Sequence, residues 1–390
     1  MGPAGERPTP SAAPASQRAD GSGWLRGPAW DTAVLAYGWV PFYLWAVLGL
    51  GLGRDGFGLA PLSRTAGSAA LATATVVALA ITYVHRHYTF LLVYGDRQTW
   101  AGRVGAYVWA PLAVIAAVAL ARASASVQLL GISPWLVVLF ITGVWNVWHT
   151  LQQRYGIGRI YAAKLGARLD QQGRGRDRLD PAAHARRDRA LLWSLALVTA
   201  AAVLVLRPAS FAGHMRARQV LRTLAPLVQP PGGTVLLLVA LAIGVFVSWR
   251  WVAAERRSGA SLRELAPRWS FVASTVMLLA VFVVHGPIVG YLCFGTAHAI
   301  EYVGFVHHFG ERKYGGAPQR NLAAALFGSI VRAPLPLAAM LGLFVLLRPW
   351  ADEAVYAVYY TVTSLLHFLF DGWIWKVRRP EVRQPLLRAS

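Results

Sequence analysis

Long apolar runs constrain the fold of this chain more than any other feature. A helix needs about 20 apolar residues to cross the hydrocarbon core of a bilayer. Ten stretches approach that length, covering approximately 31–53, 66–94, 104–121, 127–149, 190–206, 235–252, 269–285, 288–309, 321–348 and 355–377. The stretch 321–348 contains two prolines, which indicate an interfacial helix followed by a short span, or one kinked span. The sequence therefore predicts an all-α polytopic integral membrane protein, a bundle of about eight to ten transmembrane helices, with ten spans as our count.

Composition supports a membrane protein. Hydrophobic residues make up 56% of the chain and charged residues 14%, whereas about a quarter of a soluble domain is charged. The net charge of +21 comes almost entirely from arginine. In a polytopic membrane protein such an excess orients the chain and contacts anionic lipid headgroups. We expect membrane lipids as partners and no nucleic acid.

Three regions differ in character along the chain. Residues 1–27 are rich in Pro, Ala, Gly, Ser and Arg without an apolar core, which predicts a disordered tail rather than a signal peptide. Residues 28–377 form the transmembrane domain, with a polar cytoplasmic loop at 152–189. Residues 378–390 are expected to form a basic C-terminal tail.

Arginines in the connections predict the orientation. If the N-terminal tail is cytoplasmic, the inner loops around 97–103, 154–189, 250–268 and 312–320 and the C-terminal tail carry most of the basic residues, as the positive-inside rule requires. The segment 207–222 is an exception, because its four arginines would lie outside, and we predict a surface helix there. We expect a bacterial inner-membrane protein with its site towards the cytoplasm.

Imidazoles and carboxylates fall near the same ends of several apolar segments. In this topology the second, fourth, eighth and tenth spans all run from outside to inside, so their polar residues gather at one membrane face. A carboxylate in such a segment is costly and indicates a functional site, and a shared metal ion would satisfy it. The predicted metal ligands are His85, His87, His149, His298, Glu301, His307, His308, His367 and Asp371.

The spacing of these residues gives further detail. His298 and Glu301 lie three apart on one helix face, and His367 and Asp371 lie four apart, about 6 Å along the axis. Asp371 can bind a metal directly or orient an imidazole. His298 lies deeper than the pair 307–308, so it can serve a second metal or a relay. Supporting roles around the ligands are predicted for Gln153, Arg154 and Tyr302.

One cysteine, Cys293, leaves imidazole and carboxylate as the metal ligands. The adjacent His307 and His308, and the further histidines on one side of the membrane, resemble the membrane di-iron superfamily of fatty-acid desaturases and hydroxylases. That resemblance implies two irons bound by histidines at cytoplasmic helix ends. It also implies oxygen activation, a lipid-like or other hydrophobic substrate, and an electron-donor protein as partner.

Three other functions fit the same residues. Zinc bound by imidazole and carboxylate can activate water, which predicts an intramembrane lipid hydrolase. Histidines on facing helices can bind haem for electron transfer. Paired histidines and carboxylates can also form the ion relay of a transporter. The metal analysis of purified protein separates these functions.

Overall fold

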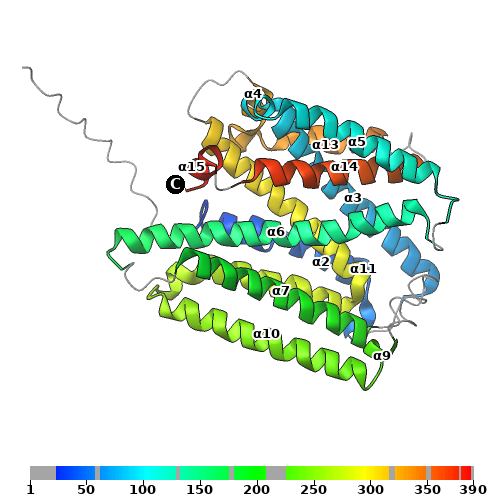
Figure 1. Cartoon of the computed structure of the whole chain (residues 1–390), viewed down its shortest axis with the longest axis horizontal. Coiled ribbons are helices and arrows are strands. Elements are labelled where there is room, and N and C mark those ends of the chain that lie inside the picture. Colours follow the sequence, from blue (N-terminus) through cyan, green and yellow to red (C-terminus); the bar gives the residue numbers. More distant parts are fainter. Residues whose placement is uncertain are drawn as a thin grey trace, which may run out of the picture.

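The computed structural model describes residues 23–57, 62–128, 132–174, 180–207, 225–315, 321–347, 353–376 and 379–387. Within these ranges the regular structure is helical, as predicted (Figure 1). In chain order the elements are α1 (Pro28–Trp30), η1 (Asp31–Ala36), α2 (Val40–Leu44), η2 (Trp45–Gly49), η3 (Arg54–Phe57), α3 (Arg64–Gly95), α4 (Arg97–Ala101), α5 (Val104–Ala123), α6 (Pro134–Gln171), α7 (Pro181–Leu206), α9 (Ala225–Val228), α10 (Gly232–Arg257), α11 (Leu262–Tyr314), α12 (Leu322–Phe327), η5 (Ile330–Arg332), α13 (Pro334–Leu347), α14 (Glu353–Ile374) and α15 (Pro380–Leu387).

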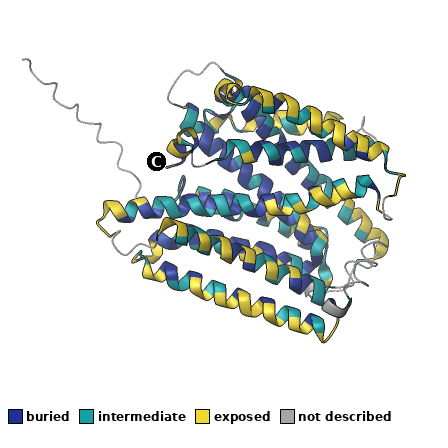
Figure 2. Ribbon diagram, viewed as in Figure 1, coloured by how far each residue is buried: buried dark blue, intermediate teal, exposed yellow. Residues whose placement is uncertain are grey.

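The surface of the bundle is apolar where the surface of a soluble protein would be polar. Helices α5 and α10 lie at the outside and expose much of their length (Figure 2). Their exposed side chains include Trp109 at 69% and Val245 at 68%. Large continuous apolar surfaces of this kind indicate contact with lipid. Together with the long apolar helices, this surface identifies an integral membrane protein.

Among the described residues, seven helices are long and apolar enough to cross a membrane, or up to eight if the bent pair over 28–49 is one span. The predicted ten spans exceed this number for two reasons. Helix α11 joins two of them, 269–285 and 288–309, in one 53-residue element that breaks at Gly286. Helix α14 is not one of the seven apolar helices, because its interior face carries the polar residues Thr361, Thr363, Ser364, His367 and Asp371. At 1.5 Å per residue α11 is about 80 Å long, enough for two spans.

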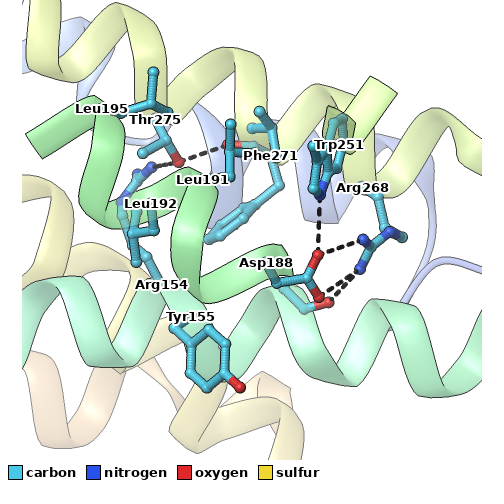
Figure 3. Close-up of a pocket in the computed structure, with 12 residues that line it drawn as sticks. Arg154, Tyr155, Asp188, Leu191, Leu192, Leu195, Trp251, Arg268, Phe271 and Thr275 are labelled. Atoms are coloured by element: carbon cyan, nitrogen blue, oxygen red, sulfur yellow. Dashed lines mark hydrogen bonds and ion pairs between the residues drawn. The ribbon is translucent and has the colours of Figure 1, made fainter. Parts of the chain in front are cut away.

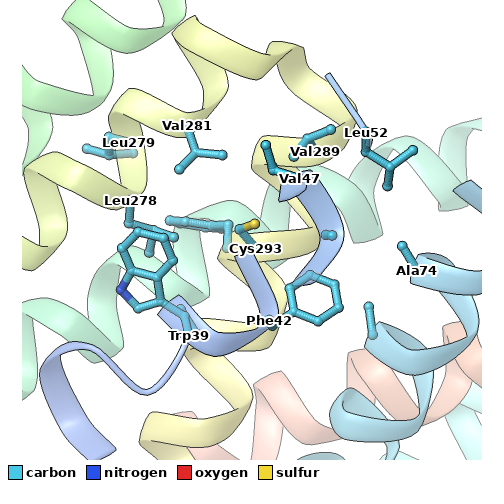
Figure 4. Packing of buried hydrophobic residues seen from close by; sticks show 14 of the residues in the cluster. Trp39, Phe42, Val47, Leu52, Ala74, Leu278, Leu279, Val281, Val289 and Cys293 are labelled. Carbon is cyan, nitrogen blue, oxygen red and sulfur yellow. The ribbon is translucent and has the colours of Figure 1, made fainter. Parts of the chain in front are cut away.

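The break in α11 organises the largest apolar cluster. Gly286 has φ 85° and ψ 169°, a conformation essentially restricted to glycine, and Pro287 follows it. The two arms of α11 consequently fold back on each other. Figure 4 shows side chains from both arms, such as Leu278 and Cys293, packing with Trp39 and Phe42 from the N-terminal segment. The core therefore lies between the N-terminal helices, α3 and the α11 hairpin.

The predicted polar loop 152–189 is wrong over most of its length. Helix α6 continues to Gln171 and α7 already begins at Pro181. The continuation is amphipathic, and it buries one face of residues three or four apart: Ile157, Ile160, Tyr161, Leu165 and Leu169. At the other side of the turn, the Asp180 carboxylate accepts hydrogen bonds from Ala182 N and Ala183 N and caps α7. Only 172–180 separates the two helices.

Both ends of the described chain are packed more tightly than predicted. Residues 1–22 of the predicted disordered tail lie outside the described residues, but Leu25 is fully buried. The Asp31 carboxylate accepts hydrogen bonds from the backbone N–H groups of Leu25 and Arg26 and from the Tyr161 hydroxyl. The predicted basic tail contains the helix α15, and its Val382 packs in the same apolar cluster as Leu25.

Basic residues gather at one end of the bundle, the left end in Figure 1, which we call the arginine-rich end. In Figure 1, α3, α6, the second arm of α11 and α14 all run from right to left. The connections at the left end include 96–103, 172–180 and 258–261. The helices that end or begin there carry basic residues close to these ends, among them Arg97, Arg168, Arg256, Arg257, Arg312 and Lys313. Of the predicted surface helix at 207–222, all but Arg207 lies outside the described residues.

Asp96 joins two of these helices at the arginine-rich end. Its carboxylate accepts hydrogen bonds from the Lys313 ammonium at 2.5 Å and the Tyr314 hydroxyl at 2.9 Å, both at the end of α11. Burial raises the pKa of Asp96, but the Lys313 ammonium and the Thr99 and Tyr314 hydroxyls outweigh it, and the pKa lies below its ordinary value. The charged carboxylate thus fixes the end of α3 to the end of α11.

Candidate metal centre

Four histidines from four helices meet in the interior of the bundle. His85 comes from α3, His149 from α6, His298 from α11 and His367 from α14. The ring centroid of His85 lies 4.8 Å from that of His298 and 4.6 Å from that of His367. The ring centroid of His149 lies 4.9 Å from each of these same two centroids. All four side chains belong to residues that are 8% exposed or less. We call these residues the four-histidine cluster.

Asp371 completes this cluster with a carboxylate. Its Oδ2 lies 3.5 Å from Nε2 of His149 and 3.7 Å from Nε2 of His367. Two sets of three residues offer ligand atoms within 4.8 Å of one another, one formed by His85, His298 and His367 and the other by His149, His367 and Asp371. A metal ion with bonds of about 2.0–2.2 Å holds its ligand atoms at most about 4.4 Å apart, and the Asp371 oxygen already lies within that distance of both imidazole nitrogens.

Several imidazole nitrogens of the cluster are buried without a hydrogen-bond partner in the described part of the chain. These nitrogens are Nδ1 of His85, Nε2 of His149, Nε2 of His367 and both ring nitrogens of His298. An unsatisfied buried polar atom costs about 1–3 kcal/mol. Because His85, His298 and His367 each offer a ligand atom within 4.8 Å of the others, a single ion binding their lone pairs would satisfy several of these nitrogens at once. The donor set and its unpaired nitrogens therefore fit a metal.

Thr89 and Tyr302 hold the carboxylate and one imidazole in place. The Thr89 hydroxyl lies 2.6 Å from Nδ1 of His367 and 2.9 Å from Oδ1 of Asp371. The Tyr302 hydroxyl donates to the same Oδ1 at 2.8 Å. These bonds leave Nε2 of His367 and Oδ2 of Asp371 facing the cluster. Tyr302 was predicted to support the ligands, and its hydroxyl contacts the Asp371 carboxylate. Thr89 was missed, although it lies four residues, or one helical turn, after His85.

Glu301 lies beside the cluster and pairs with arginine. Nη2 of Arg154 donates to Oε1 of Glu301, and both side chains are at most 2% exposed. Nη1 of the same arginine donates to the Thr275 hydroxyl at 2.6 Å. The structure thus places Glu301 outside the two groups of ligand atoms. Gln153 donates to the backbone carbonyl of His298 at 3.1 Å, which fixes the helix that carries that imidazole.

Three further predicted ligands are not brought to the cluster. His87 turns away from His85, and its ring nitrogens lie 2.6 Å from the Tyr83 carbonyl oxygen and 2.5 Å from the Tyr359 hydroxyl. Residues two apart on a helix do not share a face. Nε2 of His307 lies 3.2 Å from the Tyr88 hydroxyl, and His307 follows His298 by nine residues, which correspond to about 13 Å along α11. His308 is buried near Lys164 and Arg312.

The expectation that the histidines close their helices is wrong for α6. His149 was placed at the end of a span, but α6 continues for about six more turns to Gln171. Likewise α3 continues for about three turns beyond His85. His298, which was predicted to lie deeper, has more than four turns of α11 after it. The four helices still run in one direction (Figure 1). The cluster consequently lies inside the bundle, with helix on both sides of it.

A cavity of about 210 Å³ lies against the cluster. His85 and His298 line it, together with Arg86 and apolar side chains from α3, α11 and α14. Its residues on α3 begin at Thr75, so the cavity extends from the cluster towards the start of α3. A small molecule in this cavity would touch the cluster directly.

A second polar group lies nearer the arginine-rich end, among α6, α7, α10 and α11. Figure 3 shows Asp188 between Arg268 and Trp251, with Oδ1 of Asp188 2.8 Å from Nη2 of Arg268. Arg268 also donates to both carboxylate oxygens of Glu255 at 2.9 Å. His184, Asp188 and Glu255 have the spacing of a metal site, but Arg268 and Arg159 already neutralise the carboxylates. This group therefore acts as an ion-pair network between helices.

Comparison of the chain with protein-family models, with curated proteins and with solved structures gives no match.

Proposed function

We propose that this chain is a metal-dependent membrane oxidoreductase that acts on a hydrophobic, lipid-like substrate at the four-histidine cluster. The observation that carries the proposal is the convergence of four buried imidazoles from four helices, with nitrogens that lack hydrogen-bond partners. Buried polar atoms without partners are rare in folded proteins and need an explanation. A bound ion provides one, and the apolar surroundings suit a substrate that arrives from the bilayer.

The donor set fits iron, and its shared ligand favours a single ion. Imidazole with carboxylate suits non-haem iron, and also zinc. Both groups of ligand atoms share His367, whose Nδ1 is engaged by Thr89. Its remaining nitrogen, Nε2, binds one ion only. We therefore propose one iron here, where the resemblance to the di-iron superfamily implied two. When bound, iron would supply the redox chemistry with oxygen.

The protein's own residues would position the ligands and exclude water. Thr89 fixes the ring orientation of His367, and Tyr302 directs the carboxylate of Asp371. Hydrogen bonds of this kind usually change metal affinity 10–100-fold, as order-of-magnitude values. Burial of the cluster keeps solvent from the reacting atoms. The cavity beside His85 and His298 would hold the part of the substrate that reacts.

Haem is a weaker fit than a metal ion. The rings of the four-histidine cluster contact one another edge to face, with His85 and His367 at 87° and His149 and His298 at 87°. Such contacts leave no slot for a planar macrocycle between facing imidazoles. Zinc remains the alternative within this donor set and would change the proposed reaction to hydrolysis.

The arginine-rich end would face the cytoplasm. The helix ends on this side carry basic residues such as Arg168, Arg256, Arg257, Arg312 and Lys313, and the positive-inside rule orients basic ends inward. We propose a bacterial inner membrane as the location. An electron-donor protein would reach the oxidoreductase from this side, because a basic surface attracts an acidic partner.

The test compares two neighbouring histidines on α3. We expect purified protein to contain about one iron per chain, measured by inductively coupled plasma mass spectrometry. His85→Gln should lower the iron content on the order of tenfold or more, because it removes a ligand. His87→Gln is the matched control and should keep the iron, since His87 bonds to Tyr83 and Tyr359 away from the cluster.

Two results would contradict the proposal. If wild-type protein contained no transition metal after purification and iron reconstitution, the proposed metal centre would be contradicted. Equal iron content in His85→Gln and wild type, with both folded by circular dichroism, would place the iron elsewhere. Zinc in place of iron would instead favour the hydrolase.

A further inference from the structure

Among the described residues, Arg86 is a buried cation without a carboxylate partner. It is 2% exposed, and its Nε and Nη2 have no hydrogen-bond partner. Among the ion pairs of the described residues none includes Arg86, whereas Arg154 pairs with Glu301 and Arg268 with Asp188. Its guanidinium lies over the ring of Tyr360 at 4.3 Å. A charge in the membrane interior is costly and normally paired, so the missing partner of Arg86 needs an explanation.

The unpaired guanidinium lines the cavity next to the four-histidine cluster. This cavity of about 210 Å³ contains Arg86 together with His85 and His298. Asn146 and Tyr291 add polar groups, and Nδ2 of Asn146 donates to the Tyr291 hydroxyl at 2.7 Å. The remaining walls are largely apolar, with Leu79, Leu292 and Phe368 among them. The cavity thus combines one positive charge, a few polar groups and apolar walls.

We propose that this cavity binds the carboxylate of an amphiphilic substrate, with Arg86 as its counter-ion. The planar guanidinium pairs with a carboxylate through two parallel hydrogen bonds, and Nε and Nη2 of Arg86 are the edge that is free. The apolar walls suit the hydrocarbon part of the same molecule. The inference rests on the proposed function, and it narrows the substrate class to long-chain carboxylates.

The position of the guanidinium also bears on which part of the substrate reacts. Arg86 follows His85 directly on α3, and both line the same cavity as His298. A carboxylate paired with Arg86 would therefore bring the adjoining carbon atoms nearest to the four-histidine cluster. Chain atoms far from the carboxylate would extend away from it.

Photolabelling tests the carboxylate site without depending on turnover. The protein in nanodiscs of zwitterionic lipid is irradiated with a diazirine-bearing dodecanoate, and the labelled peptides are identified by mass spectrometry. We expect labelling in α3, α11 or α14. Unlabelled dodecanoate should compete on the order of tenfold better than dodecanol, because only the acid carries the charge.

Variants at Arg86 separate charge from shape. Arg86→Met should lower labelling on the order of tenfold, and Arg86→Lys should retain an intermediate level, since lysine keeps the charge but not the paired donors. Arg122→Met, at the exposed end of α5, is the matched control and should label like wild type. The melting temperature of Arg86→Met should be equal to or above that of wild type, because the charge it removes has no partner.

Equal competition by dodecanol and dodecanoate, or wild-type labelling in Arg86→Met, would overturn the carboxylate site. Stronger competition by dodecyl phosphate than by dodecanoate would overturn the choice of carboxylate. Iron content is measured on the same samples and reports separately on the proposed function. A metal-containing protein with labelling insensitive to Arg86 contradicts only this inference, and Arg86-dependent labelling of a protein that binds no metal contradicts only the metal centre.

Discussion

Arginines in the interior of this bundle are of two kinds. Arg154 pairs with Glu301, and Arg268 pairs with Asp188 and Glu255, all carboxylates on neighbouring helices. Arg86 is equally buried but faces a cavity. At the scale of a residue, pairing is therefore the feature that separates a structural charge from a candidate binding group.

The ion pair of Arg154 with Glu301 should be a strong determinant of stability. Arg154→Met leaves the Glu301 carboxylate buried without its cation, and we expect a loss of about 3–5 kcal/mol in the free energy of unfolding. The double variant Arg154→Met with Glu301→Gln removes both charges and should recover a large part of that loss. Denaturation of wild type, Arg154→Met, Glu301→Gln and the double variant in a detergent series measures the coupling between the two sites. Additive losses would mean that the two side chains do not act as a pair.

The sequence predicts the residues of the cluster better than their grouping. His85, His149, His298, His367 and Asp371 were all predicted ligands, because each is a polar group in an apolar segment. Glu301 was grouped with them because an arginine partner from another helix leaves no mark in the spacing. Thr89 was missed because a threonine in a transmembrane helix usually bonds to its own backbone. Here it bonds to His367 and Asp371 instead.

At the scale of elements, one residue turns the longest helix back on itself. Gly286 adopts a conformation essentially restricted to glycine, and both arms of α11 contribute to the apolar core (Figure 4). The second arm carries His298, Glu301 and Tyr302. The direction of this arm, and so the position of its imidazole, depends on the bend.

Replacing the glycine at the bend should cost stability. Gly286→Ala forces a side chain into a backbone conformation with φ 85°, and we expect a loss of about 1–3 kcal/mol. Gly342→Ala is the matched control, because Gly342 lies in helix α13 with open space where a Cβ would be added. This second variant should leave stability unchanged or raise it by about 0.5–1 kcal/mol. Thermal unfolding followed by circular dichroism compares them, and equal melting temperatures would show that the bend tolerates a Cβ.

Helix lengths were harder to predict than helix positions. Apolar runs mark the spans, but α6 extends beyond its run as an amphipathic helix, because Ile157, Tyr161 and Leu165 bury one face against neighbouring helices. The charged residues between them suggested a loop. The α15 helix was hidden in the same way among the arginines of the C-terminal region. Amphipathic helices at the membrane surface lack the continuous apolar signal that spans provide.

At the scale of the molecule, the protein is apolar outside and polar at selected places inside. Lipid-facing helices such as α10 expose apolar side chains (Figure 2), while the interior contains ion pairs and the four-histidine cluster. The basic residues at the arginine-rich end give the bundle a charge asymmetry along its helices. That asymmetry predicts which end faces the cytoplasm.

Cysteine labelling in intact cells tests the orientation. Cys293 is the single cysteine and is buried, so Cys293→Ala gives a suitable background. Gln171→Cys lies at the arginine-rich end and Ser126→Cys at the opposite end, both at exposed positions. We expect a membrane-impermeant maleimide to label Ser126→Cys in intact cells, and Gln171→Cys only after the membrane is permeabilised. The reverse pattern would mean that the bundle is inverted.

The order of the cluster residues along the chain has a consequence for biosynthesis. Helix α14 supplies His367 and Asp371 and is the last of the four contributing helices to leave the ribosome. Its buried polar face makes it a poor candidate for insertion into lipid by itself. It enters a stable environment only once α3, α6 and α11 offer Thr89, His149 and Tyr302 as partners. The four-histidine cluster therefore forms only after α14 has been inserted, and a chain interrupted before residue 353 lacks the groups that complete it.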